Sequence, residues 1–135
     1  MPIDDDRTIR KILQESRTVA VVGASSKPWR DSNSIAEFLI REGYRVIPVN
    51  PKYEEVLDLK CYPDLKSLPL AVDIVDIFRN PEQVEEIIDD AIAAKAKTVW
   101  MQLGVVNLKA AQKAEAAGLH VVMDRCILVD HRRLM

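Results

Sequence analysis

Small, hydroxyl-bearing and basic residues gather directly behind the first strongly apolar run of the chain. They are Gly23, Ala24, Ser25, Ser26, Lys27 and Arg30. Glycine permits a tight turn, hydroxyl and N–H groups hydrogen-bond oxygen atoms, and a cation near a helix N-terminus attracts an anion. The chemistry that suits this loop is binding of a diphosphate. The GxGxxG fingerprint is incomplete, since Ser25 and Pro28 stand at its second and third glycine positions. The alternative interpretation is that Gly23 closes a strand and that the polar residues behind it form a solvated loop without a ligand.

A second candidate contact follows the next apolar run, at Asn50, Pro51 and Lys52. NAD sites usually carry an acidic residue here, which accepts hydrogen bonds from the ribose hydroxyls. An ammonium at this point favours a phosphorylated ribose instead, as in NADP or the 3'-phosphorylated adenosine of coenzyme A. The alternative interpretation is that Lys52 is an exposed lysine in a turn and contacts no ligand.

Two later strand ends carry further candidates. The ring of Phe78 and the guanidinium plane of Arg79 are good stacking partners for an adenine, although an aromatic at a strand end is often core. Gln102 and Gly104 could approach the diphosphate or amide groups of a ligand, or could shape a turn.

No catalytic or metal-binding set is assigned. Cys61 and Cys126 form no CxxC pair, so we expect reduced thiols and neither a disulfide framework nor a zinc site. Asp124, Cys126 and His131 lie within eight residues of one another, but nothing in the sequence fixes their geometry.

The elements that must position these residues alternate between two patterns. Continuous β-branched runs predict strands buried in a parallel sheet, at 18–23, 44–50, 73–78, 98–104 and 120–124. Apolar stripes predict helices that end near 16, 43, 95 and 118. We therefore predict a single domain over residues 1–135 with an α/β, three-layer, Rossmann-like architecture. Its doubly wound, mostly parallel sheet has about five strands, with helices on both faces.

Three local details refine this prediction. Ser34 and Glu37 form a capping box that predicts a helix beginning at about Ile35, well behind the turn at Gly23. Pro48 lacks an N–H, which demands a bulge or an unpaired edge position in its strand. A short edge strand is expected at 60–62.

Composition narrows the function classes. The chain of 135 residues is 48% hydrophobic and 30% charged, with a net charge of -2, as in an ordinary globular domain. Its overall charge gives no broad field for a nucleic acid, although a local basic patch could still bind a phosphate. No apolar run reaches the ~20 residues of a membrane span, and the acidic start is unlike a signal peptide. We expect a cytoplasmic protein without nucleic-acid or membrane partners.

The order and spacing of these motifs resemble those of the CoA-binding domain family. The resemblance runs from TVAVVGASSKPWRDS through GYRVIPVNPKYEEVLDLKCYPDL, VDIVDIFRNPE and VWMQLGVVN to AGLHVVMDRCILVDHRRL. Members of this family are stand-alone relatives of the N-terminal domain of the succinyl-CoA synthetase α subunit. The phosphorylated histidine and the ligase machinery of that enzyme lie outside this domain, so no ligase activity is implied.

The resemblance implies that coenzyme A, free or acylated, binds at the strand ends. The loop from Gly23 to Lys27 would hold the diphosphate, and the turn at 50–52 would meet the phosphorylated adenosine. Phe78, Arg79 and Pro81 would border the adenine, with Gln102 and Gly104 along the cleft.

The leading hypothesis is a non-catalytic CoA-binding module that acts as a carrier, sensor or regulatory partner. An NADP-dependent oxidoreductase with a substrate site built by a homodimer is one alternative. An enzyme that uses Cys126 and an interaction domain without a ligand are two others. A homo-oligomer or an enzyme partner fits the ligand role equally well on the sequence alone.

Overall fold

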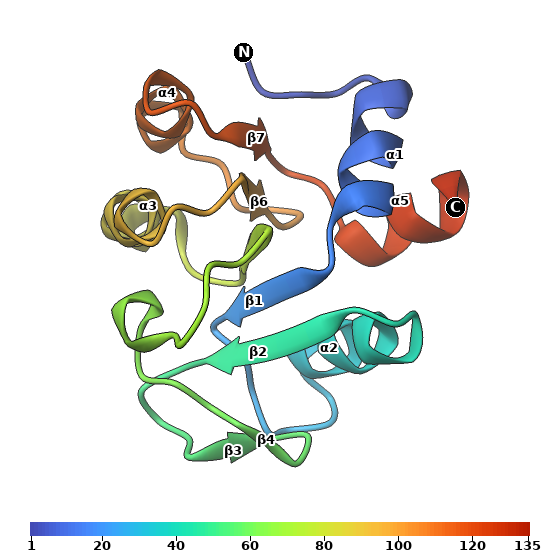
Figure 1. Cartoon of the computed structure of the whole chain (residues 1–135), viewed down its shortest axis with the longest axis vertical. Helices are drawn as coiled ribbons and strands as arrows, with labels where there is room; N and C mark the ends of the chain where they lie inside the picture. Colours follow the sequence, from blue (N-terminus) through green and yellow to red (C-terminus); the bar gives the residue numbers. More distant parts are fainter.

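A five-stranded parallel sheet forms the centre of the computed structural model, which describes residues 1–135 (Figure 1). Its strands stand in the order β2-β1-β5-β6-β7, and every neighbouring pair is parallel. They are β1 (Thr18–Val22), β2 (Arg45–Val49), β5 (Ile74–Ile77), β6 (Thr98–Met101) and β7 (His120–Val122). The chain first moves outward from β1 to β2 and then returns to β5 on the other side of β1. This change of direction creates a crevice at the carboxyl ends of β1 and β5.

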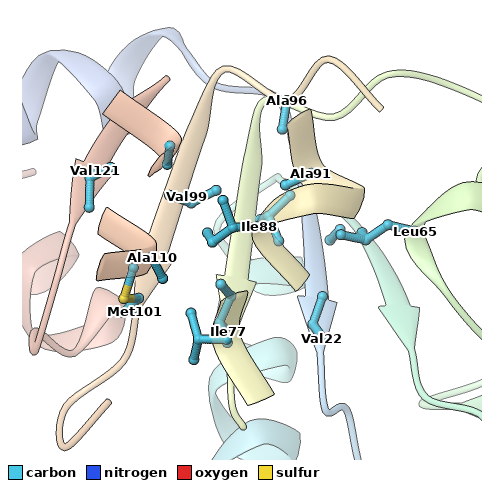
Figure 2. Close-up of a cluster of buried hydrophobic side chains, with 14 of the residues drawn as sticks. Val22, Leu65, Ile77, Ile88, Ala91, Ala96, Val99, Met101, Ala110 and Val121 are labelled. Carbon is cyan, nitrogen blue, oxygen red and sulfur yellow. The ribbon is translucent and has the colours of Figure 1, made fainter. Parts of the chain in front are cut away.

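Helices cover both faces of the sheet, which confirms the predicted Rossmann-like fold. One face carries α3 (Val84–Ala93) and α4 (Leu108–Ala116), and Figure 2 shows the core between them and the strands. The other face carries α1 (Asp6–Glu15), α2 (Asp31–Arg41) and α5 (Ile127–Leu134). None of these helices has the length and apolar composition needed to cross a bilayer.

Shorter elements complete the chain. Glu55–Val56 (β3) and Leu59–Lys60 (β4) pair as an antiparallel hairpin. Leu65–Ser67 (η1) and Pro81–Gln83 (η2) are 3-10 turns, and η2 leads directly into α3. The helix predicted to end near residue 95 is thus preceded by a 3-10 turn.

Three local features differ from the sequence-based expectation. Helix α2 begins at Asp31, four residues before Ile35, so Ser34 is not its N-cap. The Ser34 hydroxyl instead donates to the carbonyl of Asp31, inside the first turn. The helix α5 was not predicted. The expected edge strand at 60–62 is reduced to the end of β4 and a single bridge between Val49 and Tyr62.

Both outer strands of the sheet are covered by other parts of the chain. Pro48 pairs with Val21 in regular register, and β2 is an edge strand, as one of the two predicted solutions required. Along that edge the Tyr62 N–H donates to the Pro48 carbonyl, at 3.0 Å. At the opposite edge, the Ile3 N–H donates to the Val121 carbonyl of β7, at 2.7 Å.

The central strand β5 carries one charged residue, Asp76, among apolar neighbours in the strand. Asp76 has no exposed surface, and neither of its carboxylate oxygens has a hydrogen-bond partner. It lies beside Val21 of β1 and Trp100 of β6 in the sheet register. Burial raises the pKa of the Asp76 carboxyl well above its ordinary value.

Candidate functional site

A cavity of about 580 Å³ opens at the carboxyl ends of β1, β2 and β5, beside the point where the strand order reverses. Its size falls within the range of ordinary ligand sites. It is lined by Gly23, Ser25, Lys27, Trp29, Arg30, Asp31, Ser32, Asn50, Lys52, Tyr53, Phe78 and Arg79. Three predicted clusters, from the loop after β1, the turn after β2 and the end of β5, therefore meet in one place.

Gly23 shapes the entrance to this cavity. Its φ of +90° belongs to the left-handed region, and a Cβ added to it would stand 2.2 Å from the Phe78 carbonyl oxygen. The Gly23 N–H donates to the Val49 carbonyl, at 2.9 Å. The chain thus leaves β1 in close contact with the ends of both neighbouring strands, which only glycine permits.

The loop behind Gly23 is fixed by two buried amides. Asn50 donates its side-chain amide to the Ala24 carbonyl, and Asn33 of α2 donates to the Ser25 carbonyl, both at 2.8 Å. Ser25 also accepts a hydrogen bond from the Lys27 N–H, at 3.1 Å. These contacts hold the loop in one conformation before any ligand arrives, which lowers the entropy lost on binding.

The early start of α2 places its N-terminus at the cavity wall. Arg30 is the N-cap without a side-chain cap bond, and the N–H groups of Asp31 and Ser32 have no acceptor within the protein. Free amides and the positive end of the helix dipole both favour an anion. Trp29, which is 76% exposed, stands beside this N-terminus with the Lys27 ammonium 6.0 Å from its ring centre.

The turn after β2 presents Lys52. The Lys52 N–H donates to the Asn50 side-chain oxygen, at 2.9 Å, while the amide of Asn50 is bound to Ala24. The Asn50 amide group thus joins the ends of β1 and β2, while its oxygen fixes its own turn. The Tyr53 hydroxyl lies 3.5 Å from the Ser25 hydroxyl, and this hydrogen bond is the main cause of a lowered Tyr53 pKa.

Cations dominate the charge of the cavity. Lys27, Arg30, Lys52 and Arg79 line it, against the single carboxylate of Asp31. Phe78 and Arg79 are both half-buried at the end of β5, so a ring edge and a guanidinium remain open to a ligand. Four cations around a fixed turn and a helix N-terminus suit a molecule that carries several phosphates.

Six of the predicted site residues do not line this cavity: Ala24, Ser26, Pro51, Pro81, Gln102 and Gly104. Ala24 is fully buried beneath the loop, while Ser26 and Pro51 are exposed on turns. The Pro81 carbonyl accepts a hydrogen bond from the Asn107 side chain, at 2.9 Å.

Gln102 and Gly104 face the neighbouring loop instead. The Gln102 side-chain oxygen accepts the Ile127 N–H at 3.1 Å, and the Gly104 N–H donates to Asp124 at 2.7 Å. These bonds direct the end of β6 toward the start of α5.

Four lining residues were missed by sequence reasoning: Trp29, Asp31, Ser32 and Tyr53. Trp29 carried a usable signal, because a large aromatic in a polar loop is a frequent binding residue. The capping box at Ser34 predicts a start of α2 near Ile35, which leaves Asp31 and Ser32 in the preceding loop, whereas α2 begins at Asp31.

The three residues considered for catalysis are engaged separately. Asp124 binds the Gly104 N–H, and Cys126 is the half-buried N-cap of α5. His131 is buried between the rings of Phe38 and Tyr44, with centroids at 5.3 and 5.7 Å, and burial lowers its pKa. In addition, no three metal-ligating side chains converge anywhere in the chain.

Comparison with known proteins identifies the family of this chain. Residues 17–132 match the family described as CoA binding domain. The chain is 39% identical to the uncharacterized protein YneT of Bacillus subtilis, over 91% of both chains. It is 30% identical to acetate–CoA ligase (ADP-forming) I of Archaeoglobus fulgidus, covering 82% of this chain but only 18% of that ligase.

A solved structure extends the likeness to the whole fold. A hypothetical protein from Pyrococcus horikoshii OT3 superposes with a TM-score of 0.95 at 45% identity, covering 99% of this chain and 96% of that one. The family match, the five-stranded fold and the cationic cavity at its switch point agree with one another. The chain belongs to the CoA binding domain family.

Proposed function

We propose that this protein binds coenzyme A, free or acylated, in the cavity at the ends of β1, β2 and β5. It acts there without chemistry of its own, as a carrier, sensor or regulatory module. The observation that carries the proposal is the set of four cations around a fixed turn. Coenzyme A bears a diphosphate and a 3'-phosphate, which together need this kind of positive surface.

Each phosphate has its own counterpart in the proposed complex. The N–H groups of Asp31 and Ser32, with Lys27 and Arg30, hold the diphosphate at the N-terminus of α2. Lys52, on the turn fixed by Asn50, meets the 3'-phosphate. The adenine lies against Phe78 and Arg79.

The pantetheine arm leaves the cavity toward the end of β6. Gln102 and Gly104 stand there, and Leu103 between them is 71% exposed. An apolar side chain at this place suits a flexible, weakly polar arm and keeps the acyl end accessible to a partner enzyme.

Isothermal titration with three ligands tests the proposal. Coenzyme A should bind more tightly than 3'-dephospho-coenzyme A, because only the former offers a phosphate to Lys52. NADP should bind more weakly than coenzyme A. Stronger binding of NADP, or no heat change with coenzyme A, overturns the proposal.

The matched variants are Lys52→Ala and Lys60→Ala. Both remove one exposed ammonium from the same region, but only Lys52 lines the cavity. The first variant should lose the preference for coenzyme A over its dephospho form, and the second should keep it. Equal behaviour of the two variants refutes the role given to Lys52.

A further inference from the structure

A second and larger hollow lies at the amino ends of the strands, where β6 and β7 begin. It occupies about 1010 Å³ between α1 and the segments that follow α3 and α4. Arg7 and Lys11 project from α1 and Lys95 from the end of α3, over a floor that includes Thr98 and Leu119. We call it the basic groove, since five cations and two carboxylates line it.

Two of the five cations have partners within the fold. Lys97 pairs with Asp73 at 3.4 Å, and Arg10 donates to the Leu134 carbonyl at 2.8 Å. Arg7, Lys11 and Lys95 form no ion pair with any carboxylate of the chain. Their charge is therefore available to something outside the fold.

Helix electrostatics disfavours two of these cations, Arg7 and Lys11, and the third, Lys95, has an unfavourable backbone conformation. Arg7 lies in the first turn of α1, at the positive end of the helix dipole. Lys11 follows it at spacing i,i+4, which brings two like charges together. Lys95 has a φ of +59° directly after α3, in the position that glycine usually takes. Departures from local rules of this kind are typical of residues retained for function.

The floor of the basic groove combines a hydroxyl with apolar side chains. Thr98 is 2% exposed and lines the groove. Ile92 and Leu119 add half-buried apolar surface beside it. The groove thus offers cations at its rim and both a hydroxyl and apolar atoms at its base.

Helix α1 lies before the residues that match the family. The match begins at residue 17, whereas α1 ends at Glu15, so one wall of the basic groove lies outside the matched region. The groove and the CoA cavity also sit at opposite ends of the strands, so both can be occupied at once.

We infer that the basic groove is a docking surface for an acidic segment of a partner protein. Charge complementarity selects a carboxylate-rich chain, and the apolar base adds room for interspersed aliphatic side chains. The volume stands at the upper end of the small-molecule range and the rim consists of exposed long side chains, which suits a segment better than an enclosed metabolite. A flat lipid surface cannot follow a concave groove.

Fluorescence anisotropy measures this interaction directly. The probe is a short fluorescein-labelled peptide in which glutamates alternate with leucines, and its control carries glutamines in place of the glutamates. The wild-type protein should bind the acidic probe at low salt, and the control weakly. The triple variant Arg7→Ala, Lys11→Ala, Lys95→Gly should lose affinity about tenfold or more.

A charge-matched variant, Arg41→Ala, Arg45→Ala, Lys60→Ala, removes three cations that do not line the basic groove and should bind like wild type. Lys95→Gly alone should bind the probe more weakly while its Tm rises, because glycine relieves the left-handed backbone. A purely structural lysine would change the Tm without changing the affinity.

Several outcomes overturn the inference. They are no binding of the acidic probe, equal loss in the two triple variants, displacement of the probe by inorganic pyrophosphate, and stronger binding to anionic vesicles. Titration with coenzyme A separates this inference from the proposed function, because the groove variant should keep its affinity for coenzyme A.

Discussion

Replacing Asp76 with asparagine is expected to stabilise the protein at neutral pH and to leave its stability nearly unchanged in acid. The native state buries this carboxyl completely and gives its oxygens no partner, so the protonated form is the one the fold accepts. Asparagine is similar in shape and also uncharged. The substitution removes the ionisation and exchanges the O–H of the protonated carboxyl for an amide NH₂ group.

The sign and size follow from the raised pKa of Asp76. A carboxyl whose pKa is higher in the folded than in the unfolded state binds its proton more tightly when folded. The free energy of unfolding therefore falls as the pH rises from the unfolded pKa toward the folded one. Each pH unit in that window lowers the free energy of unfolding by about 1.4 kcal/mol.

Guanidinium unfolding at pH 5 and pH 7, followed by circular dichroism, measures the difference. Asp73→Asn is the control with the opposite sign. Burial raises the pKa of Asp73, but hydrogen bonds from the Arg17 and Thr18 amides outweigh it, and the pKa is lowered overall. Its stabilising effect is thus present at neutral pH and lost as the pH falls, so the Asp73 variant should be less stable than wild type at pH 7. A difference between wild type and Asp76→Asn that stays constant with pH would refute the reasoning.

Three further perturbations have defined outcomes. Lys52→Ala should weaken coenzyme A binding about tenfold to a hundredfold in isothermal titration, with no change for 3'-dephospho-coenzyme A. Gly23→Ala should lower the free energy of unfolding by about 2 kcal/mol or more, beyond the loss in Gly43→Ala, which shares a positive φ but meets no neighbouring atom; chemical denaturation compares the two. Asp130→Asn weakens the part-buried ion pairs with Arg125, at 2.7 Å, and Arg133, at 3.0 Å, and should cost about 1.5 to 3 kcal/mol at pH 7. The hydrogen bonds of Asp130 outweigh its burial and lower its pKa, so this loss should shrink in acid.

The sheet could be predicted from the sequence because its signals are local. Continuous apolar runs such as Val19 to Val22 and stripes such as Val84, Ile88 and Ala91 each identify their element without knowledge of the rest. The predicted start of α2 was wrong. Ser34 and Glu37 form a good capping pair, but the helix begins earlier, at Asp31, shortly after Pro28 and Trp29. A capping motif permits a helix start without requiring it.

The short helix α5 had a weak signal in the spacing of Ile127, His131 and Leu134. The direction of the loop after β6 had none. That loop leans toward α5 because Asp124 adopts a left-handed φ of +59° and accepts the Gly104 N–H. Such a contact joins two segments far apart in the chain, and only the folded structure brings them together.

The coverage of both sheet edges limits how copies of this chain can associate. Pro48 offers no N–H on the outer side of β2, and the carbonyl there already accepts the Tyr62 N–H. On the outer side of β7 the Val121 carbonyl already accepts the Ile3 N–H of the N-terminal segment. An incoming strand therefore finds few free backbone groups on either side, and continuous sheets between molecules are disfavoured. Self-association through side-chain surfaces is therefore favoured over the addition of strands that would lead to fibres.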